Sequence, residues 1–392
     1  MAKGSRYIIF FLPYSTGGVS KVVQNLLKYR SDFINQYKVV LTRLNQKTIT
    51  EAANLNFFKA ETEIFNYHSS ENLYCVFERL RNYIPDEESI LIANDGLELR
   101  MINALRIPNP LIYIVHGSNN YYYGLIEQFR NSMDKIITVS SYIKDQVQSK
   151  WPTEALKVNF IPFPVDDYKL SRNQFSVSNP VKILFVGSLM DSKGVLLLPE
   201  IVKRLESCSI KVELFVAGDG PLFNFLCTSF NKKDKVHLLG HVDNMKLSEL
   251  YNLADILILP SYSEGLPNVV IEAMKCGCIP LVSNLPSGIP DIIQHGYNGF
   301  VADIGSVSDF SDKIIEIVGN SLIEELRKKT IQTANQNFDP YVQAKKYINV
   351  FNNICSCNKS FNTRRPGGVF NQSWLPNTLV MMIRSMNISK KF

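Results

Sequence analysis

A regular alternation of short apolar runs with longer stretches of helical periodicity constrains this sequence more than any other feature, and it occurs twice along the chain. In the first half, the predicted strands are residues 7–12, 37–44, 89–95, 111–117, 135–140 and 157–162. Between the first two strands, apolar residues recur at helical spacing, namely Val19, Val22, Val23, Leu26 and Leu27. Continuous apolar strands separated by helices indicate a parallel sheet with helices on both faces.

A polar segment, residues 163–180, interrupts this pattern and has a proline near each end, as a linker does. The pattern then restarts, with predicted strands at residues 181–189, 211–220, 235–242, 254–261, 279–284 and 299–303. We therefore expect an α/β fold of two doubly wound domains of similar size. Ligands in such folds bind at the carboxyl ends of the strands, so a cleft between two facing domains is the expected site.

The same pattern sets the domain boundaries. We expect an N-terminal domain at residues 1–163, a linker at 164–180, a C-terminal domain at 181–336, a helix returning to the first domain at 337–354 and a tail at 355–392. The returning helix has apolar residues on one face, namely Tyr341, Ala344, Tyr347, Ile348 and Phe351.

The net charge of +6 is confined to the tail. The basic residues of the tail are Lys359, Arg364, Arg365, Arg384, Lys390 and Lys391, and it has no Asp or Glu. Without these six, the 42 basic residues of the chain fall to 36, which equals the number of acidic residues. A neutral body lacks the broad basic face to which nucleic acid binds, so we expect no nucleic-acid partner.

The cysteine spacing indicates neither a metal site nor a disulfide framework. Cys276 and Cys278, like Cys355 and Cys357, lack the two-residue gap of a zinc knuckle, and no histidine lies at ligand spacing. Reduced thiols of a cytosolic protein fit better. The apolar stretch near the N-terminus is shorter than the core of a signal peptide, and no run reaches the roughly 18 to 20 apolar residues that span a bilayer. We expect a cytoplasmic location and no metal cofactor.

The segment PSYSEGLPNVVIEAMKCGCIP places one glutamate on either side of a helix start. Glu264 follows a predicted strand, and Glu272 lies within the helix. The residues between strand and helix are Gly265, Leu266, Pro267 and Asn268. Free N–H groups of the first helical turn form an anion pocket, and side chains lean toward the helix N-terminus, so both carboxylates can approach one ligand there. A sugar nucleotide suits this arrangement, because amides and lysine bind its diphosphate while carboxylates bind its hydroxyls.

Three further groups follow predicted strands. Gly17 and Gly18 stand between the first strand and the first helix, where backbone can approach an anionic ligand. His116 ends a strand, and Lys193 lies in the loop after another, where it can reach a phosphate. A tight turn, a core histidine and a solvated lysine are the alternative interpretations of these residues.

At this point the sequence resembles a known family. Glu264 and Glu272, with seven residues between them, match the E-x7-E signature of retaining GT-B glycosyltransferases, and the wider pattern resembles glycosyltransferase family 4. The matching segments, in the order of that family, are NFIPFPVD, FVGSLMDSKG, VAGDGP, VHLLGHV, ADILILPSYSEGLPNVVIEAM and GIPDIIQHGYNGFV. The resemblance covers roughly residues 6–354 and is more specific in the second half.

The resemblance implies the GT-B fold, with two Rossmann-like domains facing across a cleft, and a C-terminal domain that binds a nucleotide sugar. Glu272 would bind the ribose hydroxyls, and Glu264 would lie near the transferred sugar. Lys193 would pair with the diphosphate. The amides that would surround sugar and phosphate are those of Gly265, Leu266, Pro267 and Asn268.

The remaining roles implied by the resemblance fall on three strand ends. His116 and the loop at Gly17 and Gly18 would reach the donor from the N-terminal domain, which otherwise binds the acceptor. The loop that would flank the nucleotide base consists of Gly240, His241 and Val242.

One position departs from the family pattern. The family usually has an arginine just after the glycine that opens the lysine loop, and here that donor-binding position is Ser188. One of two cations expected on the diphosphate is therefore missing. Asp166 and Asp167 lie in the linker, so no aspartate pair stands at a strand end to bind a metal. Lys193 and helix amides would instead stabilise the leaving diphosphate.

The favoured function is a retaining glycosyltransferase of the hexosyltransferase class, with a nucleotide-diphosphate sugar as donor substrate and UDP as the favoured nucleotide. The acceptor is a hydroxyl, as in a saccharide or lipid-linked intermediate of bacterial surface polysaccharide synthesis. A non-catalytic nucleotide-sugar-binding protein, which Ser188 suggests, and a nucleotide-sugar epimerase of the same fold are the alternatives.

The tail has the pattern of a helix that lies in a membrane interface. Trp374 begins it, and its apolar residues at helical spacing are Leu375, Leu379, Met382, Ile383 and Met386. Basic residues stand at both ends, so residues 359–392 are expected to attach the protein to an anionic membrane surface. A disordered tail and a helix that packs on the body are the alternatives.

Overall fold

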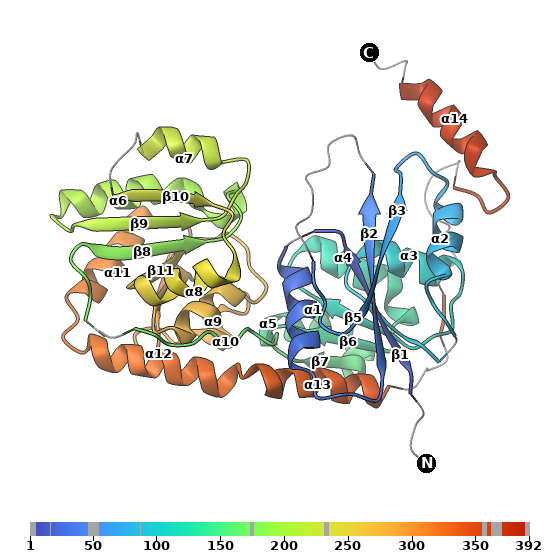
Figure 1. The fold of residues 1–392 in the computed structure, drawn as a ribbon, viewed down its shortest axis with the longest axis horizontal. Coiled ribbons are helices and arrows are strands. Elements are labelled where there is room, and N and C mark those ends of the chain that lie inside the picture. The colour runs from blue at the N-terminus through green and yellow to red at the C-terminus, as the bar shows by residue number, and fades with distance from the viewer. Residues whose placement is uncertain are drawn as a thin grey trace. The chain divides into compact units, whose positions relative to one another are not determined.

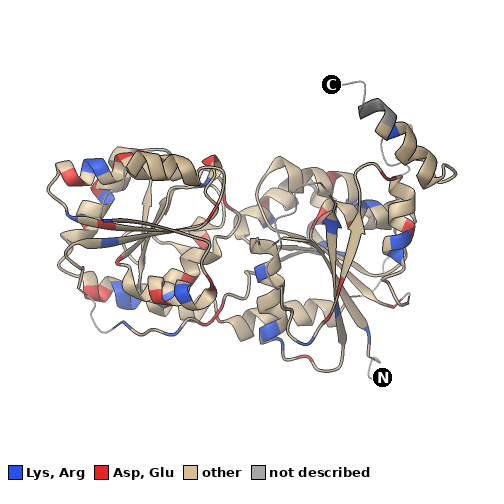
Figure 2. Cartoon of the chain, turned by 45° about the horizontal axis from the view of Figure 1, so that its top comes forward, with Lys and Arg blue, Asp and Glu red and all other residues tan. Residues whose placement is uncertain are grey.

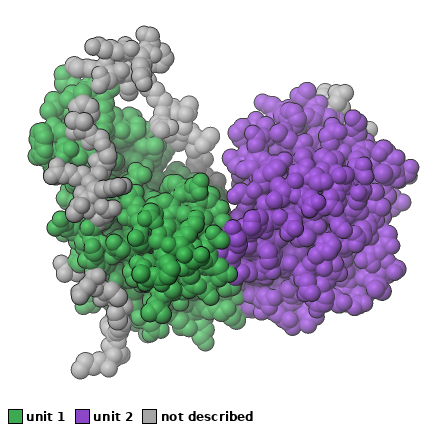
Figure 3. All heavy atoms as spheres, turned by 180° about the vertical axis from the view of Figure 1, so that it is seen from behind, with its two compact units in different colours: residues 1–139, 143–164, 341–392 green, residues 140–142, 165–340 purple. Residues whose placement is uncertain are grey.

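A computed structural model describes residues 5–15, 17–45, 55–86, 88–172, 176–230, 235–354, 359–361 and 371–388. For residues 386–388, only the backbone is described. The chain divides into two compact units, shown in different colours in Figure 3. Unit 1 consists of residues 1–139, 143–164 and 341–392, and unit 2 of residues 140–142 and 165–340. Each unit contains one parallel sheet, so the expected α/β fold with two Rossmann-like domains is confirmed.

Unit 1 is built on a seven-stranded sheet with the order β3-β2-β1-β4-β5-β6-β7 (Figure 1). Its strands are β1 Tyr7–Pro13, β2 Gln36–Leu44, β3 Glu61–Tyr67, β4 Ile90–Ala93, β5 Leu111–Val115, β6 Lys135–Thr138 and β7 Val158–Phe160. Its helices include α1 Gly18–Tyr29, α2 Leu73–Arg81, α3 Gly96–Ala104, α4 Asn120–Phe129, α5 Ser141–Lys150, α13 Pro340–Asn352 and α14 Asn377–Ile388. The central strands β4 and β5 are buried throughout, as the uninterrupted apolar runs predict.

The sequence did not predict strand β3. Its residues, ETEIFNY, are mostly polar, and Ile64 on this strand is 43% exposed. β3 is the edge strand that pairs only with β2 in this sheet, so one side of it does not need apolar cover. Lys38 on β2 forms ion pairs with Glu61 and Glu63, which supports the pairing of these polar strands.

Unit 2 is built on a six-stranded parallel sheet with the order β10-β9-β8-β11-β12-β13 (Figure 1). Its strands are β8 Val181–Val186, β9 Val212–Ala217, β10 Val236–Gly240, β11 Ile256–Leu259, β12 Ile279–Ser283 and β13 Phe300–Ala302. Its helices are α6 Leu198–Ser207, α7 Phe223–Phe230, α8 Asn244–Leu253, α9 Asn268–Lys275, α10 Ile289–Ile292, α11 Val307–Val318 and α12 Ile323–Asn337. In both units, Lys and Arg are interspersed with Asp and Glu along the chain (Figure 2).

The strand order of each sheet reverses at one point. In unit 1, β1 pairs with β2 on one side and with β4 on the other. In unit 2, β8 pairs with β9 on one side and with β11 on the other. The loops that leave such neighbouring strands diverge and open a crevice at the carboxyl edge of the sheet, where ligands of doubly wound folds bind.

The last helices connect the two units. α12 belongs to unit 2, and from Tyr341 onward the chain belongs to unit 1. Within unit 1, the Tyr347 hydroxyl of α13 donates to the Ile161 carbonyl oxygen at 3.1 Å, and the ring of Phe351 packs edge-on against Phe10. Of the predicted apolar face of this helix, only Tyr341 is largely exposed, at 63%.

The tail differs from its prediction in two respects. Its helix, α14, is docked on unit 1 rather than free, and two of its six basic residues have partners there. Lys359 forms a buried ion pair with Asp134 at 3.0 Å, and Arg384 donates to backbone carbonyls before α2. The other four, like Cys355 and Cys357, lie outside the described residues. None of the helices in the described ranges combines the length and apolarity needed to cross a bilayer.

A buried ion pair ties the core of unit 2 together. Arg327 on α12 and Asp255 before β11 are both 0% exposed, and Arg327 Nη2 lies 2.9 Å from Asp255 Oδ1. Arg327 also donates to the Gly277 carbonyl oxygen at 2.7 Å, and Asp255 Oδ2 accepts from the backbone N–H of Lys182 at 3.0 Å. Burial lowers the pKa of Arg327 to about 10, which leaves it charged at neutral pH.

We predict that Arg327→Ala destabilises the protein by about 3–5 kcal/mol, because it leaves the Asp255 carboxylate buried without its main cation. Thermal unfolding followed by circular dichroism measures the effect. Arg204→Ala is the matched control, since Arg204 and Asp312 form an exposed pair whose loss should change the stability little or not at all. Equal shifts in the two variants would contradict the assigned role of the buried pair.

Candidate functional site

Lys193 and Glu264 form an ion pair at the switch point of unit 2. Lys193 follows β8 and Glu264 follows β11, so both stand at the carboxyl edge of adjacent strands. Lys193 Nζ lies 2.7 Å from Glu264 Oε1, and the Ser261 hydroxyl donates to the same oxygen at 2.7 Å. In the part of the chain that the structure describes, Oε2 of Glu264 has no partner and is the oxygen available to a ligand hydroxyl.

Backbone contact between the two loops sets this geometry. Gly194 has a φ of +67°, and a Cβ added there would overlap the carbonyl oxygen of Pro260. The N–H of Tyr262 donates to the Ser192 carbonyl oxygen at 2.9 Å. The glycine therefore allows the lysine loop to lie directly against the loop that carries Glu264.

The residues from Gly265 to Asn268 lead from this pair into α9. The Gly265 carbonyl oxygen accepts from the N–H of Gly288 at 2.7 Å, which fixes the turn, while Leu266 is buried. Pro267 occupies the N-cap position and provides no side-chain cap to the first-turn amides. Oδ1 of Asn268 is buried, and no described group bonds to it. The start of α9 thus offers N–H donors and an unsatisfied acceptor to a ligand.

Glu272 lies one turn into α9 and is only 4% exposed. The Tyr251 hydroxyl, from α8, donates to Glu272 Oε2 at 2.8 Å. Burial and the nearby carboxylate raise the pKa of Tyr251 well above its usual value, so the tyrosine remains a proton donor. Glu272 is therefore a fixed carboxylate rather than a mobile surface group, but it is not bonded to Lys193 in the way that Glu264 is.

The other predicted donor-binding residues of unit 2 also lie at the carboxyl edge of the sheet. Ser188 follows β8 and is exposed, as expected of a position that faces a ligand or solvent. Gly240 ends β10, and its carbonyl oxygen accepts from the N–H of Gly218 at 2.8 Å. His241 after it is exposed, and Val242 is half-buried.

In unit 1, Gly17 and Gly18 stand where β1 meets α1. Gly17 is the N-cap residue, with an ordinary φ of −72°. A Cβ added at Gly18 would meet nothing within 4 Å, and one at Gly17 would meet only Ser15 at 3.7 Å. Neither backbone strain nor crowding within the described protein requires these glycines, so the alternative of a tight turn alone loses support. The open space at the N-terminus of α1 suits an approaching ligand.

His116 follows β5, and its environment keeps the imidazole neutral. Its Nε2 lies 2.8 Å from Oδ1 of Asn94, whose Nδ2 donates to the carbonyl oxygens of Phe11 and Ile92. Asn94 therefore presents an acceptor, and Nε2 of His116 carries the proton. The ring stacks on Phe163, and burial lowers the pKa of His116 to about 3. Its Nδ1 is buried without a hydrogen-bond partner among the described residues, so a ligand hydroxyl could donate to it.

The polar residues that follow β4 are site candidates that were not predicted from the sequence. Asp95 caps α3 and also accepts from the Tyr121 hydroxyl, and Glu98 accepts from the N–H groups of Asn94 and Asp95 at 2.7 and 2.6 Å. Burial and the charge of Asp95 raise the pKa of Glu98 to about 7. The sequence does contain a signal for these residues, namely Asn-Asp directly after an apolar strand. It indicates a ligand site because β4 lies next to β1, where the strand order of unit 1 reverses. The predicted site residues are thus divided between the two units, and those of each unit follow strands of its sheet.

Unit 2 is similar in sequence to one described family. Residues 167–337 match the family described as "Glycosyl transferases group 1". An uncharacterized glycosyltransferase of Methanocaldococcus jannaschii is 27% identical in an alignment 349 residues long, which covers 81% of this chain and 88% of that protein. N-acetyl-alpha-D-glucosaminyl L-malate synthase of Bacillus anthracis is 27% identical over 191 residues, which cover 47% of each chain.

Comparison of structures gives the same fold. The crystal structure of Anabaena HepE in complex with UDP superposes with a TM-score of 0.71 at 18% identity, covering 88% of this chain and all of that one. With residues 167–337 matching the group 1 family, and a glycosyltransferase matching 81% of the chain, the protein is a glycosyltransferase with the GT-B fold.

Proposed function

We propose that the protein is a retaining glycosyltransferase of family 4 that transfers a hexose from a nucleotide-diphosphate donor, with UDP as the nucleotide, to a hydroxyl acceptor. The observation that carries this proposal is the Lys193–Glu264 pair beside the start of α9. An ammonium group and helix amides suit a diphosphate, and a carboxylate suits sugar hydroxyls. UDP is supported by the crystal structure of HepE in complex with UDP, which has the same fold.

The pair also suits the charge changes of the reaction. Before donor binding, Lys193 and Glu264 neutralise one another, so the carboxylate does not repel an incoming diphosphate. When the bond between the sugar and the diphosphate breaks, negative charge grows on the leaving group. Lys193 and the N–H groups of α9 then stabilise this charge without a metal ion. Glu264 remains beside the sugar, and the sugar hydroxyls can replace Lys193 as the partner of the Glu264 carboxylate.

On the side of unit 1, His116 is suited to orient the donor sugar rather than to transfer a proton. A neutral imidazole that holds its proton on Nε2 can accept a hydrogen bond at Nδ1 from a sugar hydroxyl. For the acceptor we propose a saccharide or lipid-linked intermediate of bacterial surface polysaccharide synthesis, bound by unit 1 at the inner face of a membrane. One relative is named for the synthesis of N-acetyl-alpha-D-glucosaminyl L-malate, and L-malate has a hydroxyl group.

The test of this function is product analysis with a panel of nucleotide sugars, with and without hydroxyl acceptors, after thermal-shift selection of the nucleotide. Transfer, or slow donor hydrolysis without acceptor, supports the proposal. Conversion of the donor to its epimer without transfer would identify an epimerase. Tight binding with no turnover for any acceptor would favour the non-catalytic alternative, for which Ser188 is the motivating residue.

We predict that Lys193→Ala lowers kcat by about a hundredfold and raises KM less, because the lysine binds the leaving group most strongly in the transition state. Lys203→Ala, which removes an exposed lysine of the same unit, is the control and should leave both constants unchanged. Ser188→Arg should be neutral or increase kcat if that position faces the diphosphate. A loss confined to KM in Lys193→Ala would contradict the proposed role.

We predict that Glu272→Ala weakens nucleotide binding about ten- to a hundredfold, because a charged hydrogen-bond acceptor for the ribose contributes about 1.5–3 kcal/mol. Isothermal titration calorimetry with UDP measures it. Tyr251→Phe is the matched control, since it removes the observed hydrogen bond to Glu272 but keeps the carboxylate. Unchanged affinity in a folded Glu272→Ala protein would exclude Glu272 from the ribose site.

We predict that His116 does not titrate between pH 5 and 8, because its pKa of about 3 lies far below the ordinary value of 6.5. In the unfolded chain, the ring of His116 takes up a proton near pH 6.5. The stability that the neutral ring contributes to the folded state is therefore complete above pH 6.5 and is lost as the pH falls toward 3. Nuclear magnetic resonance of histidine ring nitrogens tests this, with His116→Gln assigning the signal. A ring that protonates near pH 6 would contradict the neutral Nε2–H form.

A further inference from the structure

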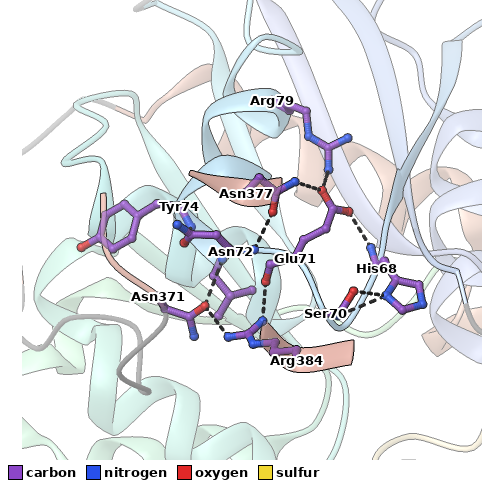
Figure 4. A network of polar contacts seen from close by, with 10 residues as sticks. His68, Ser70, Glu71, Asn72, Tyr74, Arg79, Asn371, Asn377 and Arg384 are labelled. Atoms are coloured by element: carbon purple, nitrogen blue, oxygen red, sulfur yellow. Dashed lines mark hydrogen bonds and ion pairs between the residues drawn. The ribbon is translucent and has the colours of Figure 1, made fainter. Parts of the chain in front are cut away.

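The C-terminal segment 371–388 is clamped to unit 1 by directional polar contacts (Figure 4). Asn72, the N-cap residue of α2, is 0% exposed and is the centre of this clamp. Its Nδ2 donates to the carbonyl oxygens of Gln372 and Leu375 at 2.8 and 2.7 Å. Its own N–H donates to Oδ1 of Asn377 at 2.8 Å, at the start of α14.

Two charged residues complete the clamp. Glu71 accepts from Nδ2 of Asn377 at 3.0 Å and forms an ion pair with Arg79 at 2.6 Å. Arg384, two turns along α14, donates to the Glu71 carbonyl oxygen at 2.6 Å and to Oδ1 of Asn371 at 3.0 Å. Figure 4 shows these side chains converging on the turn before α2. The contacts fix which face of α14 points toward unit 1.

The docked face consists of Asn377, Val380 and Arg384, which recur at helical spacing, and Val380 is 0% exposed. Elsewhere the described segment exposes large apolar side chains, namely Trp374 at 74%, Leu379 at 44%, Met381 at 37% and Met382 at 55%, beside the small polar residues Thr378 and Ser385. A surface helix usually buries such apolar side chains against the protein.

The charge and length of this segment decide what kind of partner it suits. The 38 residues from 355 onward have six basic and no acidic residues, and Lys359 and Arg384 are the ones with described internal partners. α14 is 12 residues long, too short to span a bilayer. A short apolar face that begins with tryptophan and lies in a cationic, acid-free segment is complementary to an anionic bilayer surface.

We propose that Trp374, Leu379, Met381 and Met382 form a membrane-contacting face, which the clamp presents outward from unit 1 and which binds the interface of a bilayer that contains anionic lipid. The apolar side chains enter the headgroup boundary, and the cationic segment adds a salt-sensitive attraction. This proposal concerns a surface remote from the residues of the donor site in sequence, and its test does not use enzymatic activity.

Tryptophan fluorescence provides a direct test with the full chain. The protein has two tryptophans, of which Trp151 is 9% exposed and Trp374 is 74% exposed. Adding vesicles of phosphatidylcholine mixed with phosphatidylglycerol should shift the emission to shorter wavelength, because Trp374 leaves water. Trp374→Phe should abolish the shift, whereas Trp151→Phe should retain it. An unchanged spectrum of the wild-type protein would overturn the proposal.

Co-sedimentation with the same vesicles tests the apolar face. The double variant Leu379→Ser and Met382→Ser should lower the partition coefficient about tenfold or more, because less apolar surface is removed from water. Leu156→Ser is the matched control and should bind like wild type, since Leu156 is 93% exposed in the same unit but lies outside the segment. Added salt, or vesicles of phosphatidylcholine alone, should weaken binding.

Three results would overturn the proposal. These are equal sedimentation of the wild type and the double variant, binding that does not depend on phosphatidylglycerol, and a concentration-dependent dimer that the same double substitution abolishes. The last result, seen by light scattering without lipid, would assign the face to a second copy of this chain.

Discussion

The close approach of Gly194 to the carbonyl oxygen of Pro260 is the contact on which the site in unit 2 depends. It places the loop after β8 against the loop after β11, and so it brings Lys193 within 2.7 Å of Glu264. The pair explains how a carboxylate can stand beside an anion-binding helix start. Its charge is matched by the lysine in the structure, and in the proposed donor complex a diphosphate takes the lysine as its partner. Any residue with a Cβ at position 194 would separate the two loops and the two charges.

The strands and most of the site positions could be predicted from sequence, because one physical rule links them. Buried parallel strands must be apolar on both faces, so they appear as uninterrupted runs, and the residues that follow them fall at the ligand-binding edge. This rule found twelve strands and placed Lys193, Glu264 and His116 at strand ends. It failed at β3, because an edge strand that pairs on one side tolerates polar residues.

Side-chain partners could not be predicted in the same way, because they depend on contacts between distant parts of the chain. Tyr251 and Glu272 are 21 residues apart, and Arg327 and Asp255 are 72 apart. Nothing in the local pattern of either residue specifies its partner. The tautomer of His116 likewise depends on Asn94, whose orientation is fixed by two carbonyl oxygens of neighbouring strands. The sequence could therefore place these residues, while their chemical states required the folded structure.

The tail shows where periodicity alone leads to an incomplete conclusion. The spacing of its apolar residues predicts an amphipathic helix, and a helix that packs on the body was one of the alternatives. The structure has the helix docked by Asn377, Val380 and Arg384, while Trp374, Leu379 and Met382 of the predicted apolar face stay exposed. The exposed apolar side chains contribute nothing to the stability of the docked helix. Docking depends instead on the clamp at Asn72, which requires several polar partners in one geometry. The stability of docking and the chemistry of the outward face are therefore set by different residues, and a partner can use that face without competing with the clamp.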